Sequence, residues 1–390
     1  MQLNTFITAL GLFAPANALL RFGCSSLTVQ RLDPLVNPGM NPSAHLHQII
    51  GGNSFNASMP PEEHDLPGLS TCTSCQFTED FSNYWTAVLF YRAKNGTFKR
   101  VPQINQAGME GTQGGMVVYY MSDALFDTAQ KSTVTAFKPG FRMLVGDAVF
   151  RDREQARKFR QLTYICMENQ GTRAPEYIGF PDKPCRGGIM ANHRFPTCWD
   201  GKNLDSPNHQ DHVAYPESGT FESGGPCPAT HPVRLPQILL ETMWDTRAFN
   251  DPADFTDGRQ PFVWSTGDAT GYSSHADYLF GWKDDSLQKA MDGHTYVSAP
   301  MLKTQTIAQQ NQCKVPDMVN EDIDSCKCLS LLNETGFLGA NYRVRRVDCP
   351  PGRESGGIEE DISRLAVVRK RHLIFLGTYL IDSSLPWTYS

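Results

Sequence analysis

The chain has 390 residues, including 32 Gly and 26 Pro, and only 19% of its residues are charged. This length can bury a substantial core, and this composition favours many loops over long helices. The formal net charge of -6 argues against a nucleic acid as partner, because phosphate-contacting proteins normally carry a basic surface.

The first 18 residues resemble a secretory signal peptide. A mostly apolar stretch from Phe6 to Ala14 precedes Ala16-Asn17-Ala18, an A-x-A cleavage pattern. No later segment reaches the roughly 18 consecutive apolar residues that span a bilayer, so we predict a secreted, extracellular protein without a membrane partner. Acceptor sites for N-glycosylation support this route and begin at Asn56, Asn95 and Asn333.

Eleven cysteines in a secreted chain predict a disulfide framework. Their clustering suggests a middle group from Cys166 to Cys227 and a C-terminal group from Cys313 to Cys349. Cys72-x-x-Cys75 fits structural disulfides better than a redox or zinc site, because no βαβ pattern and no second C-x-x-C accompany it. The odd count leaves at least one thiol free or paired with another chain.

Segments rich in β-branched and aromatic residues, mostly bounded by Gly, Pro or Asn, predict strands of antiparallel sheets. They are Tyr84–Arg92, Met116–Met121, Phe141–Phe150, Lys158–Glu168, Val233–Trp244 and Phe262–Ser265. Helical periodicity is clearest at Asp285–Asp292. The polar interval Gly171–Thr230 is expected to form ordered loops tied down by disulfides. We therefore predict a mainly β fold, an antiparallel, jelly-roll-like β-sandwich with long disulfide-tied loops and few short helices.

The domain organisation follows from the same patterns. After the signal peptide, residues 19–350 are predicted to form a single β-rich domain. Residues 351–390 change to acidic, basic and then apolar runs, and we predict a C-terminal extension, disordered or peripheral. Its apolar run from Leu373 to Ile381 is too short to span a membrane.

Two imidazoles stand on alternate residues in His45-Leu46-His47-Gln48, directly before a short apolar run. In an extended segment His45 and His47 lie on the same face. Such a pair suits a metal chelate, proton transfer or a polar sugar-binding floor. A pair of hydrogen-bonded histidines that holds neighbouring loops together is an equal alternative.

A second cluster mixes a carboxylate, an amide and aromatic rings in Asp80, Asn83, Tyr84 and Trp85. Aromatic faces beside hydrogen-bonding groups suit sugar rings. Core packing by the two aromatics, with Asp80 and Asn83 in a turn, is the alternative and is favoured for Trp85.

A third cluster lies in the loop region and contains His193, Trp199, Asp200, Lys202 and His212. Ordinary solvated loop polarity explains each of these residues equally well or better.

A fourth motif, His275-Ala276-Asp277, places an imidazole and a carboxylate on one face if extended. The acid could fix the tautomer of the ring. A surface ion pair is the alternative.

Several of these blocks resemble a known family. They are Cys24, the run Arg31-Leu32-Asp33-Pro34-Leu35-Val36-Asn37-Pro38-Gly39, His45-Leu46-His47-Gln48, Cys198-Trp199-Asp200-Gly201, Thr230-His231-Pro232 and His275-Ala276-Asp277-Tyr278. The chain is similar over Arg21 to Pro350 to secreted, mostly fungal proteins catalogued as a domain of unknown function, sometimes fused to WSC carbohydrate-binding modules. The resemblance implies work near cell-wall polysaccharide and assigns no catalytic residue.

We therefore expect a secreted, carbohydrate-active enzyme, either a polysaccharide lyase or a glycoside hydrolase. Its expected partner is a polysaccharide, and we expect it to be a monomer. The residues assigned to catalysis are His45, His47, Asp80, Tyr84, His193, Asp200, His275 and Asp277. Those assigned to substrate binding are Gln48, Asn83, Trp85, Trp199, Lys202 and His212.

Two alternatives stay open, and the cofactor is unknown at this point. One is a copper or zinc enzyme that uses His45 and His47 with a third ligand such as His193 or His275, although no metal ligand is assigned. The other is a non-catalytic, glycan-binding wall protein.

Overall fold

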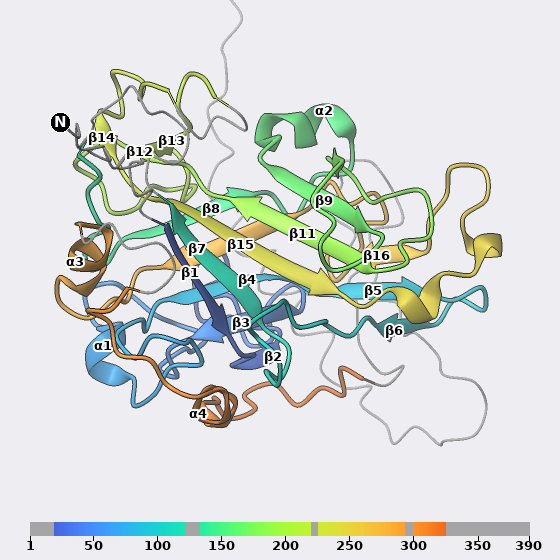
Figure 1. Cartoon of the computed structure of the whole chain (residues 1–390), viewed down its shortest axis with the longest axis horizontal. Coiled ribbons are helices and arrows are strands. Elements are labelled where there is room, and N and C mark those ends of the chain that lie inside the picture. Colours follow the sequence, from blue (N-terminus) through green and yellow to red (C-terminus); the bar gives the residue numbers. More distant parts are fainter. Residues whose placement is uncertain (1–18, 122–132, 220–224, 293–298, 325–390) are drawn as a thin grey trace, which may run out of the picture. The chain divides into compact units, whose positions relative to one another are not determined.

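A computed structural model describes residues 19–121, 133–219, 225–292 and 299–324 (Figure 1). The chain divides into two compact units, Met1–Asp348 and Cys349–Ser390, and all described residues belong to the first. The predicted signal peptide, the sequon at Asn333 and the C-terminal extension lie outside the described residues. So do Cys326, Cys328 and Cys349.

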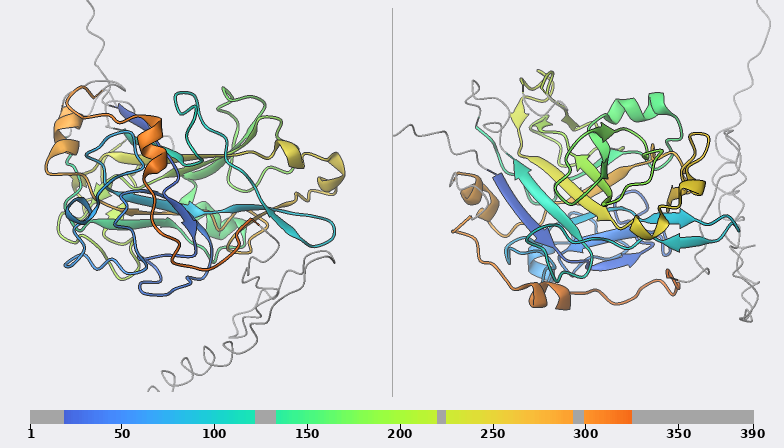
Figure 2. Two further views of the ribbon diagram at one scale, coloured as in Figure 1. Left: turned by 90° about the horizontal axis from the view of Figure 1, so that it is seen from below. Right: turned by 45° about the vertical axis from the view of Figure 1, so that its right-hand side comes forward.

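Two antiparallel sheets form most of the described unit. The six-stranded sheet has the order β1 (Leu19–Cys24), β7 (Met116–Met121), β15 (Gln237–Trp244), β11 (Gly188–Arg194), β9 (Leu162–Met167) and β10 (Glu176–Tyr177). The five-stranded sheet has the order β2 (Thr28–Gln30), β3 (His47–Gly51), β4 (Asn83–Ala87), β17 (His275–Leu279) and β8 (Arg142–Gly146). The left view of Figure 2 shows their strands as two layers.

The main core fills the space between these sheets. The six-stranded sheet contributes Phe22, Tyr120 and Ile238, and the five-stranded sheet contributes Ile50 and Tyr278, all of them buried. Because side chains of a strand alternate between its faces, every second residue of these strands reaches this core. The prediction of a mainly β, sandwich-like fold is confirmed.

A second core covers the outer face of the five-stranded sheet. There Ile49 and Trp85 pack against Leu32 from the connection between β2 and β3, and against Phe55 and Met59 from the connection between β3 and β4. All residues of β3, β4 and β17 are therefore buried. Polar side chains on these strands are enclosed by protein and need partners there.

Smaller elements complete the unit. One three-stranded sheet has the order β16 (Phe262–Trp264), β5 (Leu89–Arg92) and β6 (Phe98–Arg100), and another has β13 (Val213–Ala214), β12 (Cys198–Trp199) and β14 (Val233–Arg234). The α-helices are α1 (Leu66–Leu69), α2 (Arg153–Ala156), α3 (Ser286–Asp292) and α4 (Ile307–Gln312). The 3₁₀ turns are η2 (Arg157–Phe159), η4 (Arg247–Phe249) and η5 (Pro252–Asp254).

Two sequence-based boundaries are wrong. The interval Gly171–Thr230 is not made of loops alone, because it contains β11, an inner strand of the six-stranded sheet. The polar residues Asn192 and His193 hide this strand from a hydrophobic pattern. The segment Lys158–Glu168 begins in a helical turn, and its strand starts at Leu162.

Four disulfides join the described cysteines. They are Cys24–Cys75, Cys72–Cys313, Cys166–Cys185 and Cys198–Cys227. The middle group is confirmed. Cys313, which the clustering places in a C-terminal group, is bonded to Cys72 instead. The segment after α4 runs back to β2, where Gln30 Oε1 accepts from Met318 N at 2.7 Å. No helix of the described ranges is long and apolar enough to cross a bilayer.

Candidate metal centre

Three strands bring two distant histidines to one small residue. On the outer face of the five-stranded sheet, His47 of β3 lies opposite Ala87 of β4. On the other side of β4, Ala276 pairs with Thr86, so His275 lies beside Ala87 as well. Because alanine has only a methyl group, the two rings can approach above it, and their centroids are 5.8 Å apart.

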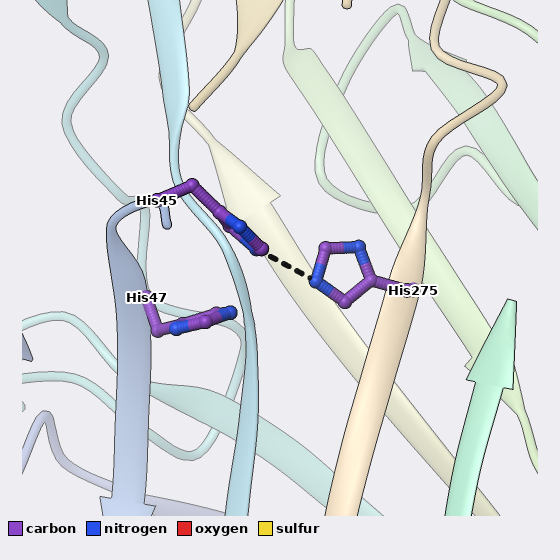
Figure 3. Close-up of side chains that lie close together, drawn as sticks. All are labelled: His45, His47 and His275. Atoms are coloured by element: carbon purple, nitrogen blue, oxygen red, sulfur yellow. Dashed lines mark hydrogen bonds between the residues drawn. The ribbon is translucent and has the colours of Figure 1, made fainter. Parts of the chain in front are cut away.

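His45 supplies the third ring from the turn that leads into β3. Its Nε2 atom lies 3.0 Å from His275 Nε2, and its ring centroid lies 4.2 Å from that of His47. One ring nitrogen from each of the three lies within 4.8 Å of the others (Figure 3). Across the described ranges, this is the one group of three or more His, Cys, Asp or Glu side chains with such spacing.

Backbone carbonyls determine which nitrogen of two rings carries the proton. His47 Nδ1 lies 2.9 Å from Leu32 O, and His275 Nδ1 lies 2.8 Å from Ser273 O. A carbonyl oxygen can only accept, so each Nδ1 must be protonated and each Nε2 carries a lone pair. His47 Nε2 is buried without a hydrogen-bond partner. This is the arrangement in which an outer hydrogen bond orients an imidazole toward a metal.

Burial keeps the three imidazoles neutral. Desolvation lowers the pKa of His47 and of His275 to about 4, and it lowers the pKa of His45 well below its ordinary value. Neutral imidazole is the form that binds metal ions, and a weak base is a poor proton acceptor at neutral pH. The site therefore suits metal binding better than general-base catalysis by histidine.

The spacing also fits a first-row metal ion. Zinc binds imidazole nitrogen at about 2.0–2.1 Å, so two nitrogens of a tetrahedral site lie about 3.4 Å apart. The separation of 3.0 Å between the Nε2 atoms of His45 and His275 is close to that edge. The separations within the group of three reach at most 4.8 Å, so the rings would have to turn toward a common centre when a metal ion binds.

Two carboxyl groups lie beside the histidines. Asp277 shares the outer face with His275, is fully buried, and neither of its oxygens has a hydrogen-bond partner. Burial raises the pKa of Asp277 well above its usual range, with a smaller contribution from Asp33. Burial also raises the pKa of Asp33, whose Oδ1 accepts from the backbone N–H groups of Leu35 and Val36. These raised pKa values favour the neutral form of both acids in the metal-free protein, and a bound cation would favour their ionised form.

The residues of this site lie in a segment that matches a protein-family model. Residues 33–282 match the model of the family described as Domain of unknown function (DUF1996), which is more than half of the chain. The protein belongs to the DUF1996 family. The match spans Asp33, the three histidines and Asp277. No curated protein and no solved structure matches the chain.

Other predicted residues of this DUF1996 protein lie next to the three histidines without joining them. His193 comes from β11 of the other sheet, and its Nε2 contacts Ser274 Oγ at 2.9 Å and Thr86 Oγ1 at 3.4 Å. Burial lowers the pKa of His193 to about 3. Gln48 faces away from His47 and donates to Ser26 Oγ. The third histidine is thus His275 and not His193.

The second cluster belongs to the core of the DUF1996 fold. Tyr84 donates to Asp80 Oδ2 at 2.9 Å and shares hydrogen bonds through Tyr120 with Tyr278. Burial raises the pKa of Asp80 to about 7. Trp85 packs on the opposite face and is fully buried, so no face of its ring is open to a sugar.

Asn83 has a backbone role in the same region. Its Nδ2 donates to Gly52 O at 2.9 Å, which ties β4 to the end of β3. Neither Asn83 nor Asp80 contacts the three histidines. The structure therefore gives the second cluster contacts of the kind that stabilise a core.

The third cluster lies on and around the small sheet of β12, β13 and β14. Asp200 Oδ1 accepts from the N–H groups of Lys202 and Asn203, which is a turn contact. Trp199 is buried, and its Nε1 donates to Asn203 O. His212 contacts Arg142 O and Ser206 Oγ. None of these residues makes a hydrogen bond or ring contact with the three histidines.

Sequence reasoning missed three residues of the candidate site. Asp33 stands in a run of the resemblance but has no chemical signal of its own. Ala87 is assigned to the site only by strand register, and Arg151 only by its hydrogen bond to Thr266 O. Neither the strand register nor this loop contact can be read from the linear sequence.

Proposed function

We propose that His45, His47 and His275 bind one zinc or copper ion through their Nε2 atoms. The orphaned Nε2 of buried His47, directed by the Leu32 carbonyl on the other side of the ring, is the observation that carries this proposal. Imidazole ligands suit both metals, and affinity for copper normally exceeds that for zinc. If the histidine rings were packed only for stability, His47 Nε2 would remain without a hydrogen-bond partner. That would cost about 1–3 kcal/mol of folding free energy.

The proposed centre resembles a catalytic site more than a structural one. Structural zinc sites are closed by four protein ligands, whereas catalytic sites use three and leave a position open. His45 is 8% exposed, against 0% for His47 and 3% for His275, so the open position faces the His45 side. When bound there, the ion would act as a Lewis acid, and Asp277 would balance its charge or accept a proton from its ligand.

We further propose that the substrate is an extracellular polysaccharide, cleaved as a hydrolase or lyase. The support is indirect. Four disulfides favour an oxidising compartment, as do the signal-like N-terminus and the sequons at Asn56 and Asn95. The resemblance to proteins fused to WSC modules supports work at the cell wall. We propose a monomer, and the net charge of -6 argues against a nucleic-acid partner.

Metal content of untagged protein tests the central part of this proposal. Protein dialysed against zinc or copper should retain one ion per chain. A content below roughly a tenth of an ion per chain, unrestored by reconstitution, would remove the proposal. A screen of the loaded protein against uronate polymers and β-glucans then tests the reaction, by new ultraviolet absorbance or reducing ends. Retention of a glycan without product would instead favour a binding protein.

A further inference from the structure

Arg151, an exposed arginine whose charge acts on His45 at longer range, is held by the loop that also holds the residue after His45. Arg151 Nη2 donates to Thr266 O at 2.8 Å. The adjacent Ser265 Oγ donates to Leu46 O at 2.6 Å, directly after His45. Two consecutive residues thus connect the guanidinium of Arg151 to the turn that presents the outermost of the three rings.

The same loop also contains the carbonyl group that accepts the hydrogen bond from His275. Thr266 Oγ1 hydrogen-bonds Ser273 Oγ at 2.6 Å, and Ser273 O is the acceptor for His275 Nδ1. Asp268 stabilises this loop, because its carboxylate accepts from Thr270 N and Ser273 N. Arg151, His45 and His275 are therefore fixed relative to one another by short contacts.

The charge of Arg151 is not neutralised by a direct ion pair. Its Nη1 donates to Ala148 O and Phe150 O, which fixes the plane of the guanidinium. Within the described part of the chain, no carboxylate lies within ion-pair distance of it, although Asp147 and Asp268 act at longer range. Arg31, the other cation near His45, is instead paired with Glu321 at 2.5 Å.

We propose that Arg151 binds an acidic sugar at the open side of the metal centre, so that the preferred substrate is a uronate-containing polysaccharide. This inference rests on the proposed function and specifies its substrate class. Within the described part of the chain, three of the five N–H groups of this guanidinium are donated to carbonyls, which leaves Nε–H and the second N–H of Nη2 for a carboxylate. A carboxylate anchored there would place the neighbouring sugar atoms over His45, next to the open ligand position.

Binding of two matched tetrasaccharides to the full chain tests this inference. The probes are β-1,4-linked tetramers of glucuronic acid and of glucose, measured by calorimetry on zinc-loaded protein. The glucuronate tetramer should bind at least 10-fold more tightly than the glucose tetramer. A charge-assisted hydrogen bond contributes about 1.5–3 kcal/mol, which corresponds to about 10- to 100-fold in affinity.

Two variants of Arg151 and one control assign the preference to this residue. R151Q should weaken glucuronate binding about 10-fold or more and leave binding of the glucose tetramer unchanged. R151K keeps the charge without the planar fork and should fall between R151Q and the unchanged protein. R153Q, which alters an exposed arginine at the start of α2, should bind like the unchanged protein.

The outcome separates this inference from the metal proposal. Equal affinity for the two tetramers, absence of binding to both, or equal behaviour of R151Q and R153Q would overturn the assignment of Arg151. Each measurement is repeated on metal-free protein. A preference for glucuronate that survives there and disappears in R151Q supports the acidic-sugar site even if the protein takes up no metal.

Discussion

The Nε2 atoms of His45 and His275 lie 3.0 Å apart, although 230 residues separate the two positions in the chain. In the metal-free protein one of these nitrogens must donate a proton to the other. His275 keeps its proton on Nδ1, toward Ser273 O, so His45 is the donor. A metal ion bound as proposed would replace that single hydrogen bond by bonds to three imidazoles, and only His45 would need to change its tautomer.

Loss of either buried histidine should abolish tight metal binding. H47A and H275A each remove an oriented lone pair from a centre with three ligands, so zinc affinity should fall by more than the roughly 10- to 100-fold lost with an outer-shell partner. Competition titration with a chromophoric chelator measures this. H231A alters a peripheral histidine that contacts Thr230 and Asp211 O, and it should bind zinc normally. Unchanged affinity in H47A would contradict the assignment.

Replacement of Asp277 should separate stability from metal binding. Asp277→Leu removes two buried, unpartnered oxygens, so the metal-free variant should be more stable by about 1–3 kcal/mol. Its zinc affinity should fall, because the variant lacks a carboxyl group on the same face that could ionise when a cation binds. Urea unfolding without and with zinc measures both effects. A metal-free variant less stable than the unchanged protein would speak against this account.

Asp80→Leu provides the matched control for that experiment. Asp80 is also fully buried, but its oxygens accept from Ser82 N and from Tyr84 OH. The same substitution there removes the acceptor from two buried donors and should destabilise the fold by about 1–3 kcal/mol. Its affinity for zinc should stay unchanged.

The ionisation of Asp80 should make the fold less stable as the pH rises. Burial raises the pKa of Asp80 to about 7, whereas an unfolded aspartate titrates near its ordinary value of 3.8. Between these values the folded state holds a proton that the unfolded state has lost, so stability decreases with rising pH until about pH 7. Asp80→Asn cannot ionise and should lack this contribution. Urea midpoints of both proteins from pH 4 to 8 test the difference, and parallel curves would contradict it.

The disulfides should contribute unequally to stability. Cys72–Cys313 closes a loop over a sequence separation of 241 and anchors the segment after α4, whereas Cys166–Cys185 spans only 19. Chain-entropy estimates give about 5 kcal/mol for the long loop and about 3 kcal/mol for the short one. Thermal unfolding of the two paired Cys→Ser variants should therefore show the larger loss for C72S/C313S. The reverse order would indicate that the long connection is already held by its packing.

Asp200 should be dispensable for the metal centre. Its carboxylate caps a turn at Lys202 and Asn203, and Asn at this position keeps one acceptor. D200N should bind zinc like the unchanged protein and lose at most about 1 kcal/mol of stability. A large loss of metal or of activity in D200N, with the fold intact, would place the third cluster back in the site.

Part of the site follows from the linear sequence. The sequence correctly predicts that His45 and His47 lie side by side, since their rings are 4.2 Å apart, but His45 stands in the turn before β3 and not in an extended segment. The choice of His275 over His193 does not follow, because both stand on strands that flank the same region. Only the register of β17 against β4, and the sheet to which β11 belongs, decide between them.

The sequence favours burial of Trp85 but does not predict the segment that covers it, for a similar reason. A strand with one solvated face would leave Trp85 open to a sugar. Here the connection between β3 and β4 covers that face with Phe55 and Met59, and contacts at such sequence distance have no local signal. Strand β11 is not predicted from hydrophobicity, because it contains polar residues that become buried only between its neighbouring strands β15 and β9.

Anomalous X-ray scattering from crystals of zinc- or copper-loaded protein tests the central claim most directly. We predict one peak, recorded at the absorption edge of the metal, about 2.0–2.1 Å from the Nε2 atoms of His45, His47 and His275. A crystal of loaded protein with no peak between these rings, and with the 3.0 Å contact between His45 and His275 unchanged, would contradict it.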